Sequence, residues 1–328
     1  MHAVRAAFPI LDLDPGNPDI DKAIAPESCE LPVPELPDIV VYIESLESRV
    51  GAKVLQRVRL FNPFILRTAL PPISATEGTK VLRLRRLGKR IVFDLEGGLF
   101  LVLHLMIAGR LRWSDGRAKP KIPGRTALAL FEFESGTLVV TEAGTRRMAS
   151  LHLVEGESAL DALHVAGMEL LDVDLASFSR QLKANNHTLK RALTDPHLFS
   201  GIGNAYSDEI LHRARLSPIA MTQKLDDGEI AFLYDAIRST LNEWTGRLRE
   251  QAGGKFPENV TAFRDGMAVH GRYGKPCPVC ASPVQRIVYG THETNYCARC
   301  QSGGRVLADR ALSRLLKKSW PRSIEELE

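Results

Sequence analysis

The pattern of apolar and polar positions divides the chain into a β-rich first part and a helical second part. From Asp38 onward apolar residues recur at helical spacing, which predicts an amphipathic helix over residues 38–49. Alternating or continuously apolar runs follow it and predict a succession of strands. The expected strands are 53–60, 79–86, 90–95, 99–105, 127–134 and 137–142. This order predicts an antiparallel β-sandwich domain with a flanking helix.

After Leu170 the apolar period becomes helical. The expected helices are 174–185, 188–194, 203–214 and 226–251. The segment Gly201-Ile202-Gly203-Asn204 predicts a tight turn into a helix, with Asn204 close to the helix start. Gly253-Gly254 and Pro257 then open a loop that leads to two cysteine pairs. The fold class is therefore α+β, with an N-terminal β-sandwich, a C-terminal helical domain and a small metal module.

Composition limits the class of protein. The 328 residues, 44% of them hydrophobic, are enough for two packed domains. No run of eighteen apolar residues is present, so a membrane span is not expected. The apolar stretch near the start is short and is followed by acidic residues, unlike a secretory signal. We therefore expect a cytoplasmic protein without a membrane partner.

Charge is unevenly distributed along the chain. Residues 1–33 hold two basic and six acidic residues, a balance of −4, so the overall +4 leaves +8 for the remaining 295 residues. The first segment is rich in Pro and Asp without a sustained period and is predicted to be a disordered leader. The basic remainder favours an anionic partner such as nucleic acid.

The clearest chemical signal is a pair of Cys-x-x-Cys motifs separated by sixteen residues, formed by Cys277, Cys280, Cys297 and Cys300. Two such pairs joined by a hairpin suit tetrahedral zinc, and four thiolates leave no open coordination position. The sequence predicts one structural Zn²⁺, in preference to unligated cysteines or disulfides. Cys29 lies in the leader and has no assigned role.

A run of motifs in order resembles the formamidopyrimidine-DNA glycosylase and endonuclease VIII family. Pro34-Glu35 followed by Leu36-Pro37 is similar to the N-terminus of the formamidopyrimidine branch, where an initiator Met is removed from the proline. The further matches are Leu87-Gly88-Lys89-Arg90, His104-Leu105 through Ala108-Gly109, Arg146-Arg147, Gly201-Ile202-Gly203-Asn204 and the terminal cysteine pairs.

The resemblance implies a helix-two-turns-helix domain, a zinc finger and a bifunctional DNA glycosylase/AP lyase of base excision repair. The implied domains are a leader at 1–33, a catalytic β-sandwich at 34–155, a helix-two-turns-helix domain at 170–255, a zinc finger at 268–301 and a basic tail at 302–328. Oxidised purines such as 8-oxoguanine or formamidopyrimidines are the favoured lesions. The implied partner is double-stranded DNA with damaged bases or abasic sites, bound by a monomer.

The implied catalytic residues are Pro34, Glu35 and Lys89. An N-terminal proline is a secondary amine that attacks the sugar C1′ and forms an iminium ion. Glu35 would act as the acid that opens the sugar ring or releases the base. The lysine that matches Lys89 contacts DNA phosphate and assists catalysis, and β- then δ-elimination cleaves the strand. Asp38 matches a family glutamate, although it could equally cap the first helix.

The peptide bond before Pro34 raises a difficulty, because Val33 makes the proline nitrogen a tertiary amide without a free lone pair. We expect translation to begin at residue 33, where a GUG codon is read as methionine that is then removed. Proteolytic maturation is the alternative. If residues 1–33 remain, the chain would instead be a non-catalytic damaged-DNA-binding protein.

DNA contacts are also implied by the resemblance. Side chains that fill the gap left by a flipped base are expected at Ile107, Arg146 and Met148, with Met106 in place of Ile107 if the register differs by one. Core packing is the other reading of Ile107 and Met148. Phosphate contacts are expected from His104, Lys89, Asn204 and the zinc hairpin.

Two departures from the family pattern affect these expectations. His292 stands where the family has an arginine, five residues before the third cysteine. Imidazole is only partly charged at neutral pH, so we expect a weaker phosphate contact and less efficient δ-elimination there, unless Arg286 or Arg299 takes over the contact. The stretch 252–270 is also difficult to match to the family's loop over 8-oxoguanine, which leaves oxidised purines and pyrimidines both open. A zinc-ribbon transcription or translation factor is the remaining reading, but it leaves the Pro34-Glu35 motif unexplained.

Overall fold

The computed structural model describes residues 33–116, 124–143, 147–165, 167–258, 260, 264–289, 292–308 and 321–326. The predicted leader, apart from Val33, and part of the basic tail lie outside these ranges. The first element is helix α2 (Leu36–Val50), at the position that the apolar period predicts. Its apolar face is buried through Ile39, Tyr42 and Leu46.

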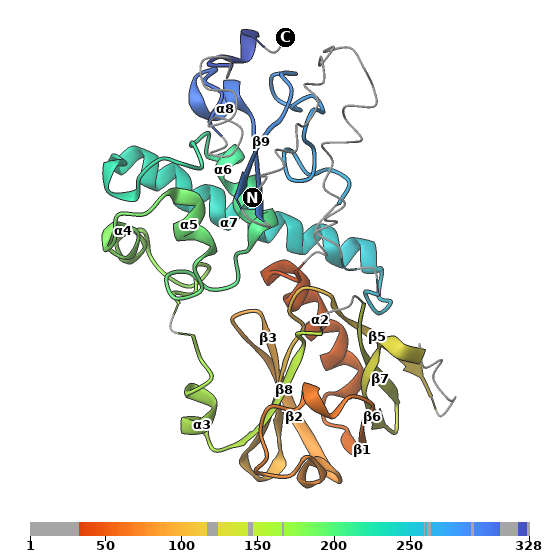
Figure 1. Ribbon diagram of the computed structural model, residues 1–328. Coiled ribbons are helices and arrows are strands. Elements are labelled where there is room, and N and C mark those ends of the chain that lie inside the picture. Colours follow the sequence, from red (N-terminus) through yellow and green to blue (C-terminus); the bar gives the residue numbers. More distant parts are fainter. Residues whose placement is uncertain are drawn as a thin grey trace, which may run out of the picture. The chain divides into compact units, whose positions relative to one another are not determined.

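Eight strands form one continuous antiparallel order, β5-β7-β6-β1-β2-β3-β4-β8 (Figure 1). Their bounds are β1 Val54–Leu60, β2 Thr79–Leu87, β3 Arg90–Leu95, β4 Leu99–His104, β5 Gly109–Asp115, β6 Ala127–Phe133, β7 Gly136–Glu142 and β8 Ser150–Glu155. Strands β1 and β2 pair only at Val54–Lys80 and Leu55–Thr79. This short pairing is the corner at which the order passes from one four-stranded half to the other.

The two halves share one apolar core, as a sandwich requires. Phe93 from β3 stacks on Phe131 from β6, with ring centroids 6.3 Å apart. Leu101 of β4 and Leu138 of β7 belong to the same buried cluster, and α2 adds Tyr42. The predicted sandwich with its flanking helix is therefore confirmed. Strands β5 and β8 were not predicted, because short segments with several polar residues give a weak period-2 signal.

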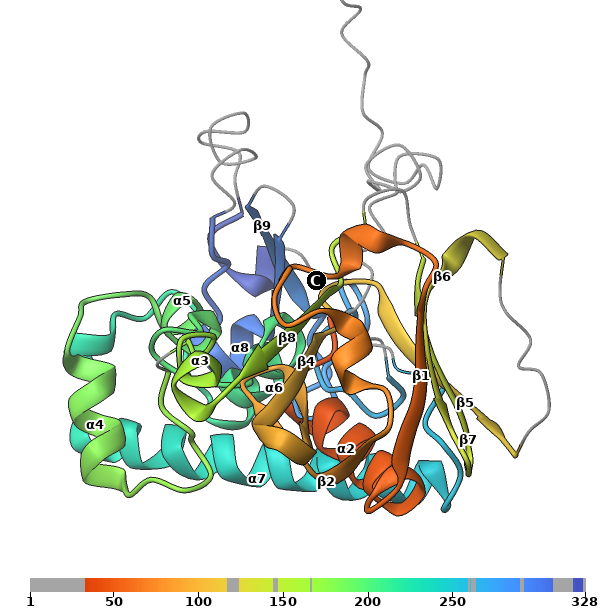
Figure 2. The ribbon, with the colours of Figure 1, turned by 90° about the horizontal axis from the view of Figure 1, so that it is seen from below.

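The second half of the chain is helical. The helices are α3 Glu157–Asp161, α4 Leu175–Lys183, α5 Leu189–Thr194, α6 Asn204–Arg213 and α7 Asp227–Ala252. Helix α7 begins in a capping box formed by Asp226 and Glu229 and ends at Gly253, which has a left-handed conformation. It packs against both α6 and α2 (Figure 2). Helix α2 thus links the sandwich to the helical part, and its Leu36 belongs to the helical core.

The zinc module contains a β-hairpin of β9 (Gln285–Tyr289) and β10 (His292–Tyr296), followed by the short helix α8 (Ala298–Ser302). Tyr296 and Ala298 pack in a small core with Leu307 and Ile324. The described part of the tail therefore lies against the zinc module rather than apart from it. The 3₁₀ turns are η1 Pro63–Ile65, η2 Ile73–Thr76, η3 Glu96–Gly98, η4 Gly124–Thr126, η5 Thr222–Lys224 and η7 Ile324–Glu326.

Among the described residues, none of the helices combines the length and the apolar character that a membrane crossing needs.

Candidate functional site

Pro34 and Glu35 lie immediately before α2 and are both buried, with Glu35 2% exposed. The chain is anchored there by Leu36, whose N–H donates to the carbonyl of Gly201 at 2.9 Å. The helix begins at Leu36 and its N-cap is Glu35, so the reading of Asp38 as the N-cap is wrong. Asp38 is instead the third residue of the helix, and one of its carboxylate oxygens accepts the Glu35 N–H at 2.9 Å.

The carboxylate of Glu35 occupies the N-terminus of α6. It accepts hydrogen bonds from the backbone N–H groups of Gly203 at 2.5 Å, Ala205 at 2.9 Å and Tyr206 at 3.4 Å. The first amides of a helix have no partner within the helix and attract anions through the helix dipole. The anion at this helix start is a side chain of the same protein.

Lys89 reaches the same place from the turn between β2 and β3, where Gly88 has a φ of 63°. A Cβ atom added to Gly203 would lie 2.6 Å from Lys89 Nζ and 2.6 Å from Glu35 Cδ, so glycine leaves the space that these two groups use. Burial lowers the pKa of Lys89, and the nearby carboxylates of Glu35 and Asp38 partly oppose this effect. The Lys89 ammonium and the Glu35 carboxylate thus both lie against Gly203, at the N-terminus of α6.

Asp38 has a second partner, because Arg264 donates to its other carboxylate oxygen. Both side chains are buried, at 4% and 8% exposure. Desolvation raises the pKa of Asp38, while the charge of Arg264 and the hydrogen bond from Glu35 act in the opposite direction. Nothing in the sequence pattern singled out Arg264, because its partner lies 226 residues away along the chain.

His104 ends β4 and is paired in register with Arg90 and Ser150. Desolvation lowers the pKa of His104 to about 4, with further contributions from Arg90, Lys89 and His152. The imidazole is therefore neutral at physiological pH. Any contact of His104 with a phosphate would be a hydrogen bond without a full positive charge.

Two of the three predicted wedge residues, Ile107 and Met148, lie on loops next to the sandwich. Ile107 is 39% exposed, in a turn in which Met106 has a positive φ of 52°. Met148 is partly buried, and its N–H donates to Glu142 at 2.8 Å. Arg146 lies outside the described residues. Glu142 also accepts from the Ala149 N–H, so this buried carboxylate, which the sequence did not reveal, shapes the loop that carries Met148.

Asn204 is the first residue of α6, as the turn motif predicts. Its side-chain amide donates to the carbonyl of Glu293 in β10 at 2.9 Å, which ties the helix to the zinc hairpin. His292 is exposed at the start of β10, opposite Tyr289. The structure brings the hairpin and the α6 N-terminus together, but the phosphate contacts of Asn204 and His292 stay predictions.

The four predicted metal ligands converge. Their sulfur atoms all lie within 4.8 Å of one another. Cys280 and Cys297 sulfurs are 3.3 Å apart, and those of Cys277 and Cys300 are 3.9 Å apart. A tetrahedral zinc with Zn–S bonds of about 2.3 Å would place its sulfurs roughly 3.8 Å apart. The donor set and its spacing therefore fit one structural zinc ion.

Three residues of α6 hold the zinc module, and the sequence did not identify them. Glu209 accepts the N–H groups of three successive residues, 268 to 270. Asp208 accepts from Lys190 at 2.5 Å and lies 2.8 Å from the His270 ring. His212 Nε2 lies 3.3 Å from Cys277 Sγ. One signal for these residues was available in the sequence. Two acidic residues and a histidine lie in a predicted helix beside the apolar residues Tyr206, Ile210 and Leu211.

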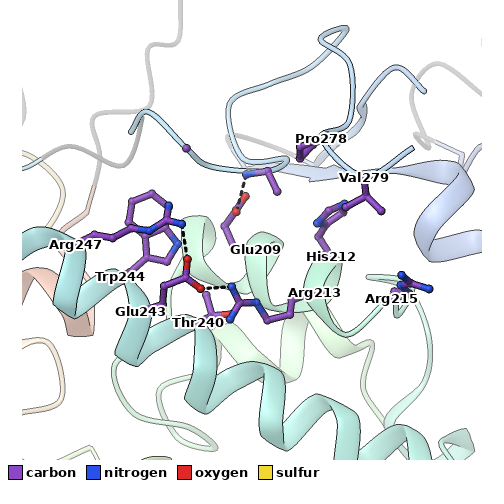
Figure 3. A pocket seen from close by; sticks show the side chains of 12 residues that line it. Glu209, His212, Arg213, Arg215, Thr240, Glu243, Trp244, Arg247, Pro278 and Val279 are labelled. Atoms are coloured by element: carbon purple, nitrogen blue, oxygen red, sulfur yellow. Dashed lines mark hydrogen bonds and ion pairs between the residues drawn. The ribbon is translucent and has the colours of Figure 1, made fainter. Parts of the chain in front are cut away.

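Two cavities adjoin these elements. The first, about 320 Å³ in volume, lies between α6, α7 and the first cysteine pair (Figure 3). Figure 3 shows Arg213 and Arg247 both reaching Glu243, so two of its cations are neutralised within the protein. The second, about 750 Å³ in volume, is lined in part by Asp38, Arg264 and Phe256.

Comparisons with known proteins agree with this arrangement. Residues 33–151 match the formamidopyrimidine-DNA glycosylase N-terminal domain, residues 167–247 match its H2TH domain, and residues 274–303 match a zinc finger found in FPG and IleRS. The formamidopyrimidine-DNA glycosylase of Thermus thermophilus is 34% identical over 279 residues, which cover 83% of this chain and 100% of the relative.

Further relatives and solved structures extend this result. The formamidopyrimidine-DNA glycosylase of Cereibacter sphaeroides is 34% identical over 82% of this chain and its own full length. The crystal structure of the MutM (Fpg) protein from Thermus thermophilus superposes with a TM-score of 0.70 at 33% identity, covering 82% of this chain and 98% of that one. The Lactococcus lactis Fpg in complex with abasic-site DNA has a TM-score of 0.72 at 23% identity, covering 82% and 99%, and supports the fold alone.

Proposed function

Since the chain belongs to the formamidopyrimidine-DNA glycosylase family, we propose that it is a DNA glycosylase of base excision repair that excises oxidised bases and then cleaves the strand as an AP lyase. The family is established by a relative that is 34% identical over its full length. The observation that carries the proposal is that the side chains of Glu35 and Lys89 meet at the N-terminus of α6, with Pro34 immediately before Glu35 in the chain. The zinc finger binds one structural zinc ion through its four cysteines.

The proposed nucleophile is the amine of Pro34 in a form of the protein that begins at this residue. A secondary amine attacks C1′ of the damaged nucleotide, the glycosidic bond breaks, and the base leaves with a proton. Opening of the sugar ring then gives an iminium ion between Pro34 and C1′. Loss of the 3′ phosphate by β-elimination and of the 5′ phosphate by δ-elimination completes strand cleavage.

The roles of the neighbours follow from their positions and from the family resemblance. The N–H groups of Gly203, Ala205 and Tyr206 hold the Glu35 carboxylate in one position. The family resemblance assigns to Glu35 the proposed role of proton donor for ring opening or base release. Lys89 lies beside it and is proposed to contact the DNA phosphate at the lesion. Because burial lowers its pKa, Lys89 is also better able to give up a proton than an exposed lysine.

The proposed DNA interface uses residues on both sides of this centre. Ile107, Arg146 and Met148 would fill the space left by the flipped nucleotide. His104, Asn204 and His292 would contact phosphates, and the net positive charge outside the first segment supports an anionic partner. We expect a monomer that acts on double-stranded DNA in the cytoplasm.

A non-catalytic damaged-DNA-binding protein is the second candidate, and one observation favours it. In the full chain the Pro34 nitrogen is an amide bonded to Val33 and cannot attack. The family match begins at residue 33, which supports a start at this point instead. Intact-mass measurement of the protein from its native host decides between them. A mass that begins at Pro34 supports the enzyme, and a mass that includes residues 1–33 supports the binder.

A further inference from the structure

A buried ion pair connects the start of α2 to the segment that follows α7. Arg264 donates to one oxygen of Asp38, and the other oxygen of Asp38 accepts the N–H of Glu35 at 2.9 Å. The side chains of the pair are 8% and 4% exposed. Arg264 is therefore two hydrogen bonds away from the peptide unit that carries the proposed nucleophile.

This arrangement fixes the Pro34–Glu35 peptide unit from both sides. The Glu35 side chain is held by the amides of α6, and its backbone N–H is held by Asp38. Asp38 has little freedom of its own, because Arg264 holds its second oxygen. Loss of Arg264 would leave the Asp38 carboxylate with the hydrogen bond from the Glu35 N–H.

We infer that Arg264 is a positioning residue for the reaction at Pro34, acting through Asp38 to hold the Pro34–Glu35 peptide unit in its reactive orientation. The inference rests on the proposed function of Pro34 as the nucleophile. By the family resemblance, the position of Asp38 is otherwise occupied by glutamate, which is longer by one methylene. In this chain the shorter carboxylate is met by the guanidinium of Arg264.

The electrostatic surroundings make Asp38 dependent on this arginine. Glu35 and Tyr42 face it from its own segment, and Lys89, Arg110, Tyr206 and Arg264 face it from the other elements. Arg264 is the cation that touches it, and among the causes that lower its pKa the charge of Arg264 is the largest. Replacement of Arg264 by a neutral residue therefore raises the pKa of Asp38, and the carboxyl group takes up a proton at higher pH.

The test uses the form that begins at Pro34 and an abasic-site duplex, with borohydride trapping followed in single turnover from pH 5.5 to 8.5. We expect Arg264→Met to slow trapping about tenfold or more at pH 6.5, because small misplacements of a reacting group have large effects on rate. The acidic limb of the pH–rate profile of Arg264→Met should move to higher pH. The Kd of this variant for the same duplex should stay within about twofold of the parent value. Arg264→Lys should restore most of the rate.

Arg249→Met is the matched control. Arg249 of α7 likewise forms an ion pair with a carboxylate of α2, that of Glu44, which lies nine residues after Glu35 in the chain. Arg249→Met should form the borohydride-trapped adduct at the same rate as the parent. If Arg264→Met folds poorly, Asp38→Asn/Arg264→Met removes both charges of the pair, and the acidic limb that Asp38 causes should then disappear.

Three results would overturn the inference. Equal trapping rates and equal pH profiles for Arg264→Met and the parent would exclude a positioning role. An equal loss in Arg249→Met, or a reduced amplitude with an unchanged profile, would indicate a general structural effect. If the parent form gives no trapped adduct, the proposed function is wrong, and the inference about Arg264 is wrong with it. If the parent gives an adduct and Arg264→Met behaves like the parent, only the inference about Arg264 is wrong.

Discussion

The proposed reaction centre and the zinc module are both held by helix α6, but by different parts of it. At its N-terminus, backbone amides hold the carboxylate of Glu35, the residue immediately before α2. Further along, the side chains of Asp208, Glu209 and His212 hold the zinc module. One helix of ten residues thus fixes two sites that are far apart in the sequence.

The difference between these two attachments indicates how each region responds to change. The reaction centre depends on hydrogen bonds from backbone groups of α6, which substitution leaves in place. The zinc module depends on buried carboxylates and on a metal, whose loss removes folding free energy. Changes in the zinc module should therefore weaken binding to all DNA, whereas changes in the reaction centre should reduce chemistry and leave binding intact.

The largest effect is expected for Cys297→Ser. Structural zinc in small modules contributes on the order of 10 kcal/mol to folding, so loss of one of the four thiolates should unfold the finger. DNA binding should then weaken for undamaged and damaged duplexes alike. Zinc content measured with a chelating dye, together with binding to both duplexes, tests this expectation. Normal DNA binding by a zinc-free variant would show that the module has no part in DNA contact.

The next largest effect is expected for Asp208→Asn. Asp208 is fully buried and accepts from Lys190 and the backbone N–H of Asn295. The variant therefore leaves the ammonium of Lys190, whose side chain is 14% exposed, without its counter-ion. Breaking such a pair costs about 3 kcal/mol. Urea unfolding measures the loss. Asp227→Asn is the control. The Asp227 side chain is 98% exposed, so its substitution should change the free energy of unfolding little. Equal stabilities of the two variants would contradict the assigned role of Asp208.

Lys89→Met should separate stability from chemistry at the reaction centre. Burial lowers the pKa of Lys89 in the folded protein below its value in the unfolded chain. The cost of burying its charge is therefore full at pH values below the folded pKa, and it disappears as the pH rises from the folded pKa to the unfolded pKa of about 10. Lys89→Met should increase the free energy of unfolding at pH 7, with a smaller gain at pH 10, while strand cleavage falls. A pH-independent difference in stability would show that Lys89 carries no desolvation cost.

The smallest effect concerns His104. Since its pKa is about 4, the imidazole adds no charge to DNA binding above pH 6. His104→Gln should therefore leave the slope of log K against log salt unchanged, whereas loss of a cation that contacts phosphate lowers it by about one. Binding titrations at three salt concentrations give the slope. A reduced slope in His104→Gln would mean that DNA restores the charge of the imidazole.

The sequence predicted the elements that have a strong period and the residues that lie in short motifs. Helix α2, the strands from β1 to β4 and the cysteine site follow directly from local patterns. The helix-start error at Asp38 arose because aspartate suits both the N-cap and the third position of a capping box. Only the backbone geometry distinguishes these positions.

Residues that act through long-range contacts could not be predicted in this way. Arg264 pairs with a residue 226 positions earlier, and Glu209 binds backbone groups about 60 positions later. Such pairings depend on how α2, α6 and the zinc module pack together, and no local spacing encodes that packing. The anion bound at the α6 N-terminus is another example, because only the fold brings Glu35 to Gly203.

The central claim is that the amine of Pro34 is the nucleophile and is silent while Val33 remains attached. Borohydride trapping on duplex DNA with an 8-oxoguanine or an abasic site, with the full chain and the form that begins at Pro34 side by side, tests it most directly. The account predicts a covalent adduct, located at Pro34 by peptide mass, only for the shorter form, and its loss in Pro34→Gly with lesion binding retained. Equal trapping by the full chain, or binding without trapping by the shorter form, would contradict it.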